Sequence, residues 1–170
     1  DHDWVSKHRS LLLSSLGSGK FSKDALAIFD QVHSEKYEIL SDLGRASIKS
    51  VSDYLGLSTN TKFVDSANIA ADQSSSKRLL ELVKQFNGNT YVTGLGALNY
   101  LDHQLFEASS IEVRYMNYTI KEYMQSFDGF TPYVTALDAI SQLGPNAIHA
   151  LQSSTVNWRD AIERYNELHA

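Results

Sequence analysis

The sequence contains no cysteine, which excludes disulfide scaffolds, thiolate zinc sites and a cysteine nucleophile. It also lacks a basic cluster, because no run of Lys and Arg is longer than Lys77-Arg78 and the formal net charge is -5. Nucleic acid and anionic membranes attract basic patches, so we expect neither as a partner. No apolar run approaches the roughly 20 residues of a membrane-spanning helix, which predicts a chain without membrane insertion.

No secretory signal is visible, and the absence of disulfides fits a cytoplasmic protein. The sequence starts at Asp1 rather than Met, so we expect further residues upstream. With 170 residues, of which 42% are hydrophobic and 21% charged, the chain has the size and composition of one globular domain. Its oligomeric state cannot be deduced from these features.

The first third of the chain has the apolar spacing of amphipathic helices. Helices are expected over residues 4–16, from Ser22, and from Ser41 to Leu55 with Gly56 as the C-terminal cap. Glycine inside a helix costs about 1 kcal/mol relative to alanine, so Gly44 weakens the third of these predictions. The sequence therefore predicts a helical subdomain over residues 1–58.

Residues 59–170 have the alternating pattern of an α/β protein. Strands are expected at 61–65, 90–94 and 112–116, with a helix from the Ser74–Ser76 segment to Asn87 and a mostly helical segment at 97–108. Further helices are expected at 136–143 and after Asn157. Strand–helix–strand order with short connections predicts parallel strands. The predicted fold is a helix-rich single α/β domain with a small, largely parallel sheet.

Gly94-Leu95-Gly96 follows the second expected strand. Glycine permits close approach of a ligand to the backbone, and the N–H groups at the start of a helix attract a phosphate or carboxylate. The segment lacks the third glycine of the dinucleotide fingerprint and the Lys-Ser/Thr of a P-loop. The alternative interpretation is a tight turn without a ligand.

Tyr100 and Asp102, which follow this turn, are candidate substrate-binding and catalytic residues. Tyr100 is a candidate substrate-binding residue, and Asp102 could orient a sugar hydroxyl or amine or act as a general base. The alternative for Asp102 is a cap on the helix that follows it.

The chain is rich in tyrosine, with nine in all, and tyrosine offers a flat apolar face with a hydroxyl group for stacking on a sugar or base. Tyr115, Tyr118 and Tyr123 lie close in sequence to Gln125 and, further along, to Asp138. We expect these five residues to contribute to one site, with Asp138 as a second catalytic carboxylate. The alternative for each tyrosine is ordinary half-buried packing.

Histidine does not predict a metal site here. His8, His33, His103 and His149 lack an acidic or histidine neighbour at metal-ligand spacing on a common helix face. Trp4, Lys7 and His8 would lie within one helical turn, with surface or packing roles as the alternative. There is no Gly-x-Ser-x-Gly elbow and no His-Glu-x-x-His motif.

An ordered set of residues runs through nearly the whole chain: Trp4, Lys7-His8, Leu79-Leu80, Tyr91, Gly94, Gly96, Tyr100-Leu101-Asp102, Phe106, Val113, Tyr123, Gln125, Phe130, Pro132, Leu137-Asp138 and Gly144. This set resembles the WbqC-like family, which is associated with O-antigen and surface-polysaccharide gene clusters. Proteins of this family carry an N-terminal portion ahead of the Trp-x-x-Lys-His segment, and Thr135 stands where serine is expected.

The resemblance implies an enzyme, or part of one, in surface-polysaccharide synthesis. We expect transfer of a small group to a nucleotide-linked amino sugar, with reaction and cofactor undefined. The alternatives are a non-catalytic nucleotide-sugar-binding module and an interaction protein in a biosynthetic complex.

In open α/β sheets, ligands bind beyond the carboxyl ends of the strands. The sequence therefore predicts one pocket in which the backbone at Gly96 takes a phosphate and the tyrosines stack on the sugar or base. Its expected lining is Gly94, Leu95, Gly96, Tyr115, Tyr118, Tyr123, Gln125 and Asp138.

Overall fold

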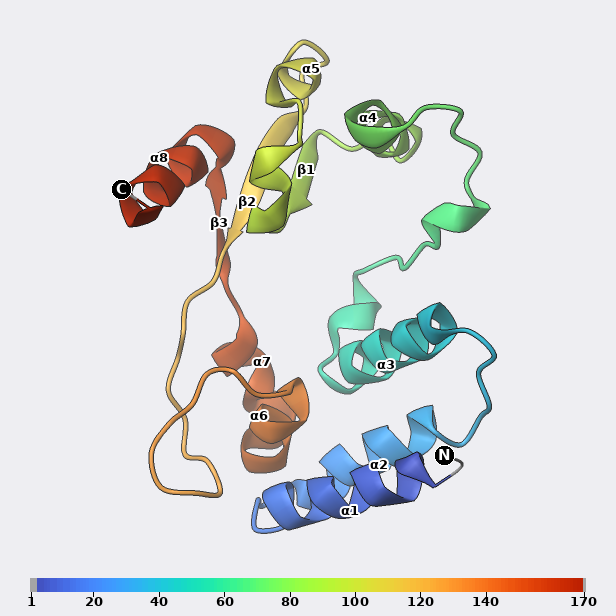
Figure 1. Cartoon of the computed structure of the whole chain (residues 1–170), viewed down its shortest axis with the longest axis vertical. Helices are drawn as coiled ribbons and strands as arrows, with labels where there is room; N and C mark the ends of the chain where they lie inside the picture. Colours follow the sequence, from blue (N-terminus) through green and yellow to red (C-terminus); the bar gives the residue numbers. More distant parts are fainter. Residues whose placement is uncertain (1–2, 170) are drawn as a thin grey trace. The chain divides into compact units, whose positions relative to one another are not determined.

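A computed structural model describes residues 3–169 of the chain. The chain is helix-rich with a small mixed sheet, and it forms two compact units (Figure 1). Unit 1 comprises residues 1–63 and 120–152, and unit 2 comprises residues 64–119 and 153–170. Each unit is therefore built from two separate stretches of sequence. None of the helices within the described residues is long and apolar enough to cross a membrane.

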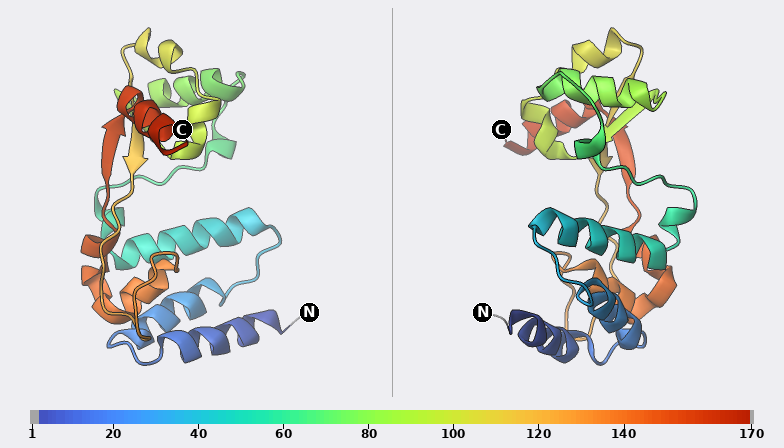
Figure 2. Two further views of the ribbon diagram at one scale, coloured as in Figure 1. Left: turned by 60° about the vertical axis from the view of Figure 1, so that its left-hand side comes forward. Right: turned by 90° about the vertical axis from the view of Figure 1, so that its right-hand side faces the viewer.

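Unit 1 is helical, and its elements α1 to α3 lie in layers in both views of Figure 2. The helix predicted from Ser22 is present as α2. Its apolar residues recur at helical spacing, and Ala25, Ile28, Phe29 and Val32 are all buried. The elements of unit 1 are α1 (Trp4–Leu16), α2 (Ser22–Val32), α3 (Leu40–Tyr54), η1 (Leu57–Thr59), α6 (Ala136–Leu143), η4 (Gly144–Asn146) and α7 (Ala147–Leu151).

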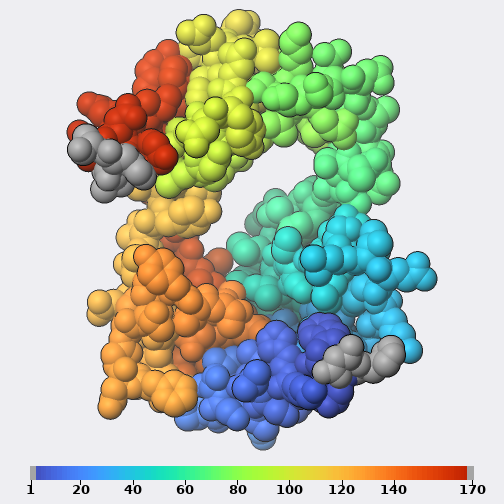
Figure 3. All heavy atoms as spheres, viewed as in Figure 1, coloured from blue at the N-terminus to red at the C-terminus, as the bar shows by residue number. Residues whose placement is uncertain are grey.

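The core of unit 1 joins its two stretches of sequence. Leu16, Ala25 and Ile28 from the first stretch pack with Ala139 and Ile140 from α6. In Figure 3 the orange spheres of the second stretch lie directly against the blue spheres of α1 and α2. The backbones also meet, because the N–H of Phe21 donates to the carbonyl of Ser141 at 2.7 Å.

Unit 2 contains the sheet, whose strand order is β1-β2-β3. β1 and β2 pair in parallel, as the sequence predicts, whereas β3 pairs antiparallel with β2. The elements of unit 2 are η2 (Ser66–Asn68), α4 (Ser75–Gln85), β1 (Thr90–Thr93), η3 (Leu95–Asn99), α5 (His103–Glu107), β2 (Glu112–Asn117), β3 (Ser154–Asn157) and α8 (Trp158–His169).

One strand prediction is wrong. Residues 61–65 alternate as a strand would, but they have no regular structure, and Phe63 and Val64 are exposed. A strand needs a partner for its backbone hydrogen bonds, and β2 takes β3, a strand not predicted from the sequence, as its second neighbour. The segment predicted as helical at 97–108 is divided into η3 and α5, because Asp102 begins a new helix there.

His103 connects three elements of unit 2. Its Nε2 lies 2.8 Å from the hydroxyl of the fully buried Tyr115, and its ring stacks on Trp158 with centroids 4.5 Å apart. The Trp158 indole N–H in turn donates to Glu107. Burial lowers the pKa of His103 below its ordinary value, against the opposing effects of Asp102 and Glu107. Folding therefore favours the neutral ring.

This burial predicts a pH dependence of stability. Because the unfolded chain binds a proton at His103 more readily than the folded chain, the contribution of the neutral ring is fully present above about pH 6.5 and is lost as pH falls through the folded pKa. Urea unfolding across this range is expected to give a free energy that falls with acidification, and a smaller fall in His103→Gln. The exposed His149→Gln is the control. An equal pH dependence in both variants would contradict the assignment.

Candidate functional site

Unit 1 brings together three of the residues predicted for the site. The Tyr123 hydroxyl donates to Asp138 Oδ2 at 2.7 Å, and Gln125 Nε2 donates to the same oxygen at 2.9 Å. Within the part of the chain that the structure describes, no donor is bonded to Oδ1 of Asp138. The carboxylate is therefore held firmly through one oxygen while the other remains for a ligand.

The start of α6 positions this carboxylate. Thr135 is the N-cap, with extended backbone and a side chain that accepts a hydrogen bond from the N–H of Leu137. Asp138 consequently lies in the first helical turn, where the helix dipole favours a negative charge. Its residue is buried, with 8% exposure, so its interactions are poorly screened by water.

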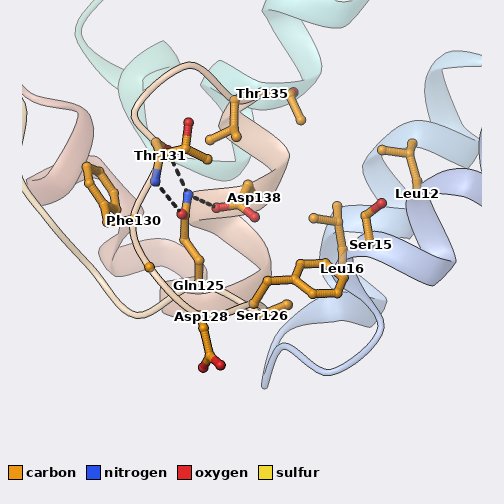
Figure 4. A pocket seen from close by; sticks show the side chains of 13 residues that line it. Leu12, Ser15, Leu16, Gln125, Ser126, Asp128, Phe130, Thr131, Thr135 and Asp138 are labelled. Atoms are coloured by element: carbon orange, nitrogen blue, oxygen red, sulfur yellow. Dashed lines mark hydrogen bonds between the residues drawn. The ribbon is translucent and has the colours of Figure 1, made fainter.

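Gln125 also fixes the loop that leads from Tyr123 to α6. Its Oε1 accepts from the N–H of Thr131 at 2.9 Å, and its Nε2 donates to the Thr131 carbonyl at 3.0 Å (Figure 4). The loop bends at Gly129, whose φ of +84° lies in the region that favours glycine. The Phe130 ring then packs edge-on against Tyr123, with centroids 5.5 Å apart. One amide side chain thus connects the loop to the carboxylate.

A hollow of about 470 Å³ lies over these groups. In Figure 4 the loop and α6 form one side of it, and Leu12, Ser15 and Leu16 of α1 form the opposite side. None of the described residues that line it is basic. The lining residues are Leu12, Ser15, Leu16, Gln125, Ser126, Phe127, Asp128, Gly129, Phe130, Thr131, Val134, Thr135 and Asp138. This Asp138 pocket has its two carboxylates on the side of the loop and α6, and apolar side chains on both sides.

Tyr123 acts in this site as a hydrogen-bond donor. Burial and the hydrogen bond to Asp138 raise the pKa of its hydroxyl to about 12. The group therefore keeps its proton throughout the neutral range and stabilises negative charge on Asp138. Tyr123 is not among the residues that line the hollow, so its position fits the support of Asp138 better than direct proton exchange with a ligand.

The other predicted site residues belong to unit 2. Tyr115 is fully buried in the core of that unit, and Tyr100 and Tyr118 are exposed. The Asp102 side chain accepts from the N–H of Leu105, so it caps α5, as the alternative interpretation predicts. Since Tyr123, Gln125 and Asp138 lie in unit 1, the single pocket predicted from the sequence stays a prediction.

Gly94 and Gly96 lie where β1 turns into η3. Gly94 has an extended backbone with φ of −84°, and a Cβ added at either glycine would meet nothing within 4 Å. The fold therefore does not require glycine at these two positions, and the space above them is open. Binding of a phosphate at this turn stays a prediction.

Part of the pocket could not be recognised from the sequence. The loop at residues 126–134 has no regular pattern, and Leu12, Ser15 and Leu16 resemble any residues on an amphipathic helix. The sequence does indicate the site through Gln125 and Asp138, the polar residues on either side of this loop. Among the described residues, no group of three His, Asp or Glu lies together as metal ligands would.

Removing the amide of Gln125 should loosen the loop. In Gln125→Ala the Thr131 N–H loses its acceptor, so we expect its hydrogen exchange to accelerate by about tenfold or more. Gln142→Ala is the control, because Gln142 bonds the loop only at the Ser126 hydroxyl. Hydrogen exchange of the Thr131 amide is measured by NMR. An exchange rate in Gln125→Ala equal to that of the unmodified protein would contradict the role of Gln125.

The fold and this pocket define a helix-rich α/β protein with a carboxylate-centred site in its helical unit. Residues 1–150 match the model of the WbqC-like protein family, and the chain belongs to that family. It is 29% identical over 147 residues to the uncharacterized protein Rv1507c of Mycobacterium tuberculosis. The matched region covers 85% of this chain and 63% of that protein, so this chain spans less than two thirds of its relative. No solved structure matches the chain.

Proposed function

We propose that this chain is part of an enzyme of surface-polysaccharide synthesis and that the Asp138 pocket holds the amino group of a nucleotide-linked amino sugar. Membership of the WbqC-like family supports the pathway. The observation that carries the assignment is the buried Asp138 carboxylate, which is fixed through Oδ2 and has Oδ1 available at a hollow of about 470 Å³.

The charge of the lining supports an amine at this point in preference to a phosphate. Asp128 and Asp138 are its charged members, and no basic side chain among the described lining residues balances them. An ammonium group gains a charge-assisted hydrogen bond from a carboxylate, whereas a phosphate would be repelled. The apolar wall from Leu12 and Leu16 suits the carbon face of a sugar ring.

The same geometry suits the transfer of a small group to the amine. Oδ1 of Asp138 would take the proton that the ammonium must lose, and the freed nitrogen lone pair would attack an activated group carried by a second substrate. The new bond forms between the sugar nitrogen and the transferred group, and the bond between that group and its carrier breaks. The carrier leaves with the bonding electron pair and takes up the second proton that the nitrogen loses. Asp102 has a capping role in unit 2, and we assign it no part in this step.

Ligand-observed NMR tests the binding. A nucleotide-linked sugar with a free amine is compared with its N-acetylated form and with the corresponding hydroxyl sugar. We expect the free amine to bind about tenfold or more tightly than either, since a hydrogen bond to a charged group contributes about 1.5–3 kcal/mol. Equal affinities would refute the assignment. Binding without product, when candidate acyl donors are added, would favour the non-catalytic binding module.

A further inference from the structure

Unit 1 contains a cluster of four aromatic rings that the Asp138 pocket does not use. Trp4 and His8 lie one turn apart on α1, and Phe29 of α2 lies one turn before His33, the C-cap residue of that helix. Each ring contacts two others in a closed cycle, with centroid distances of 6.3 Å for Trp4–His8, 5.2 Å for His8–Phe29, 4.0 Å for Phe29–His33 and 5.4 Å for His33–Trp4.

An ion pair keeps the two helices in this register. The Arg9 guanidinium on α1 donates two hydrogen bonds to the Asp30 carboxylate on α2, at 2.6 and 2.8 Å. Both residues neighbour the cluster in sequence, since Arg9 follows His8 and Asp30 follows Phe29. The paired rings of α1 and α2 are thereby held opposite one another.

A hollow of about 290 Å³ opens beside the cluster. Its floor is buried, with Ile28, Phe29 and Val32 each at most 6% exposed, whereas Trp4 at its rim is 46% exposed. A half-exposed tryptophan beside buried apolar side chains offers apolar ring surface to a planar ligand. Ser47 of α3 and Thr135, the N-cap residue of α6, also line this hollow.

The polar side chains that line this hollow are His8, His33, Ser47 and Thr135. His33 Nδ1 lies 2.8 Å from the Phe29 carbonyl, which can only accept, so Nδ1 carries the proton and Nε2 is left for a ligand. Ser47 donates its hydroxyl proton to the carbonyl of Leu43, which leaves its oxygen as an acceptor. None of the described lining residues is Asp, Glu, Lys or Arg, so the lining offers no carboxylate to an ammonium group and no lysine or arginine to a phosphate.

We propose that this aromatic hollow binds a planar heteroaromatic ring of the nucleobase class. Aromatic side chains bind bases by stacking, which contributes about 1–3 kcal/mol per base, and His33 and Ser47 offer hydrogen-bonding groups to the edge of the ring. Thr135 lines both this hollow and the Asp138 pocket, so both sites meet at the start of α6. The inference deepens the proposed function and rests on it for the source of the base, the nucleotide that carries the amino sugar.

Tryptophan fluorescence can test this site separately from the Asp138 pocket. The chain has two tryptophans, so Trp158→Phe leaves Trp4 as the single reporter. Uridine and adenosine are titrated against this variant, with ribose as the control without a ring and benzyl alcohol as an aromatic ring without nitrogen. A saturable change in Trp4 fluorescence is expected for at least one nucleoside and for neither control.

Two substitutions on α3 then locate the binding. Ser47→Leu fills the hollow and should weaken nucleoside binding by about tenfold or more, while Ser41→Leu places the same side chain on an exposed part of the same helix and should change it by less than about twofold. Circular dichroism confirms that both variants fold. Equal responses to nucleoside and benzyl alcohol, or equal affinities in both variants, would overturn the proposal.

The nucleoside titration does not depend on the sugar amine that is proposed to bind at Asp138. Uridine and adenosine lack the sugar amine, so Asp138→Asn should leave their binding unchanged. Nucleoside binding together with failure of the amine comparison would refute the proposed function and leave this site in place. Failure of both nucleosides, with a preserved preference for the amine, would refute this site alone.

Discussion

Replacing Gly144 with alanine is expected to cost about 3 kcal/mol or more of unfolding free energy. Gly144 has φ of +60° and ψ of −137°, a region that is essentially restricted to glycine. An added Cβ would also lie 2.8 Å from two carbons of the Phe21 ring, which sits where the turn before α2 meets the end of α6. For a chain of this size, the loss corresponds to a fall in melting temperature of roughly 6–12 °C.

Substitution of two other glycines distinguishes the cost of backbone strain from the cost of a steric clash. Gly129 has φ of +84° but open space around its Cβ position, so Gly129→Ala should cost about 1 kcal/mol from strain alone. Gly96 has open space and is not among the glycines with positive φ, so Gly96→Ala should change stability by less than about 0.5 kcal/mol. Calorimetry on the three variants should show the largest loss of stability for Gly144→Ala, a smaller one for Gly129→Ala and the smallest for Gly96→Ala. A Gly144→Ala protein as stable as Gly96→Ala would contradict the packing described here.

Asp138→Asn is expected to preserve the fold and to reduce affinity for an amine-bearing sugar by about 10–100-fold, because hydrogen bonds to charged groups contribute about 1.5–3 kcal/mol. The asparagine oxygen can still accept from Tyr123 and Gln125, so the loop keeps its support. The negative charge that would attract the ammonium group is lost. Isothermal titration calorimetry measures the change in affinity.

Asp128 provides a matched control. It lines the same pocket from an exposed part of the loop, so Asp128→Asn should change affinity by less than about threefold, as a solvent-screened charge does. Asp138→Ala differs again, because it leaves the Tyr123 hydroxyl without its acceptor and should cost about 1–3 kcal/mol of stability. Equal affinity losses in Asp128→Asn and Asp138→Asn would argue against a specific carboxylate site.

Elements with strong local signals were predictable. The helices at 4–16 and 136–143 have the predicted bounds, and the strand predicted at 90–94 covers 90–93, because apolar period and capping residues act over a few positions. The strand expected at 61–65 has the right alternation, but strand formation depends on a partner that local sequence does not specify. β3 is such a partner, and it is distant from β2 in the sequence.

The site divides in the same way. Tyr123, Gln125 and Asp138 lie within one short stretch of chain, so their proximity was visible in the sequence. The contribution of α1 to the pocket was not visible in the sequence, because more than a hundred residues separate Leu12 from the loop that it faces. Tyr115 was expected at a ligand, yet the two-residue period of β2 places it on the same buried face as Val113.

The division of each unit into two stretches has a consequence for folding. Pairing of β2 with β3 closes a chain loop between Asn117 and Ser154, and most of that loop belongs to unit 1. Packing of α2 against α6 likewise closes a loop that contains residues 64–119 of unit 2. Whichever unit forms first shortens the free chain that the other must close, and each halving of such a loop lowers the entropic cost by about 0.6 kcal/mol. The connectivity alone therefore makes the assembly of the two units cooperative.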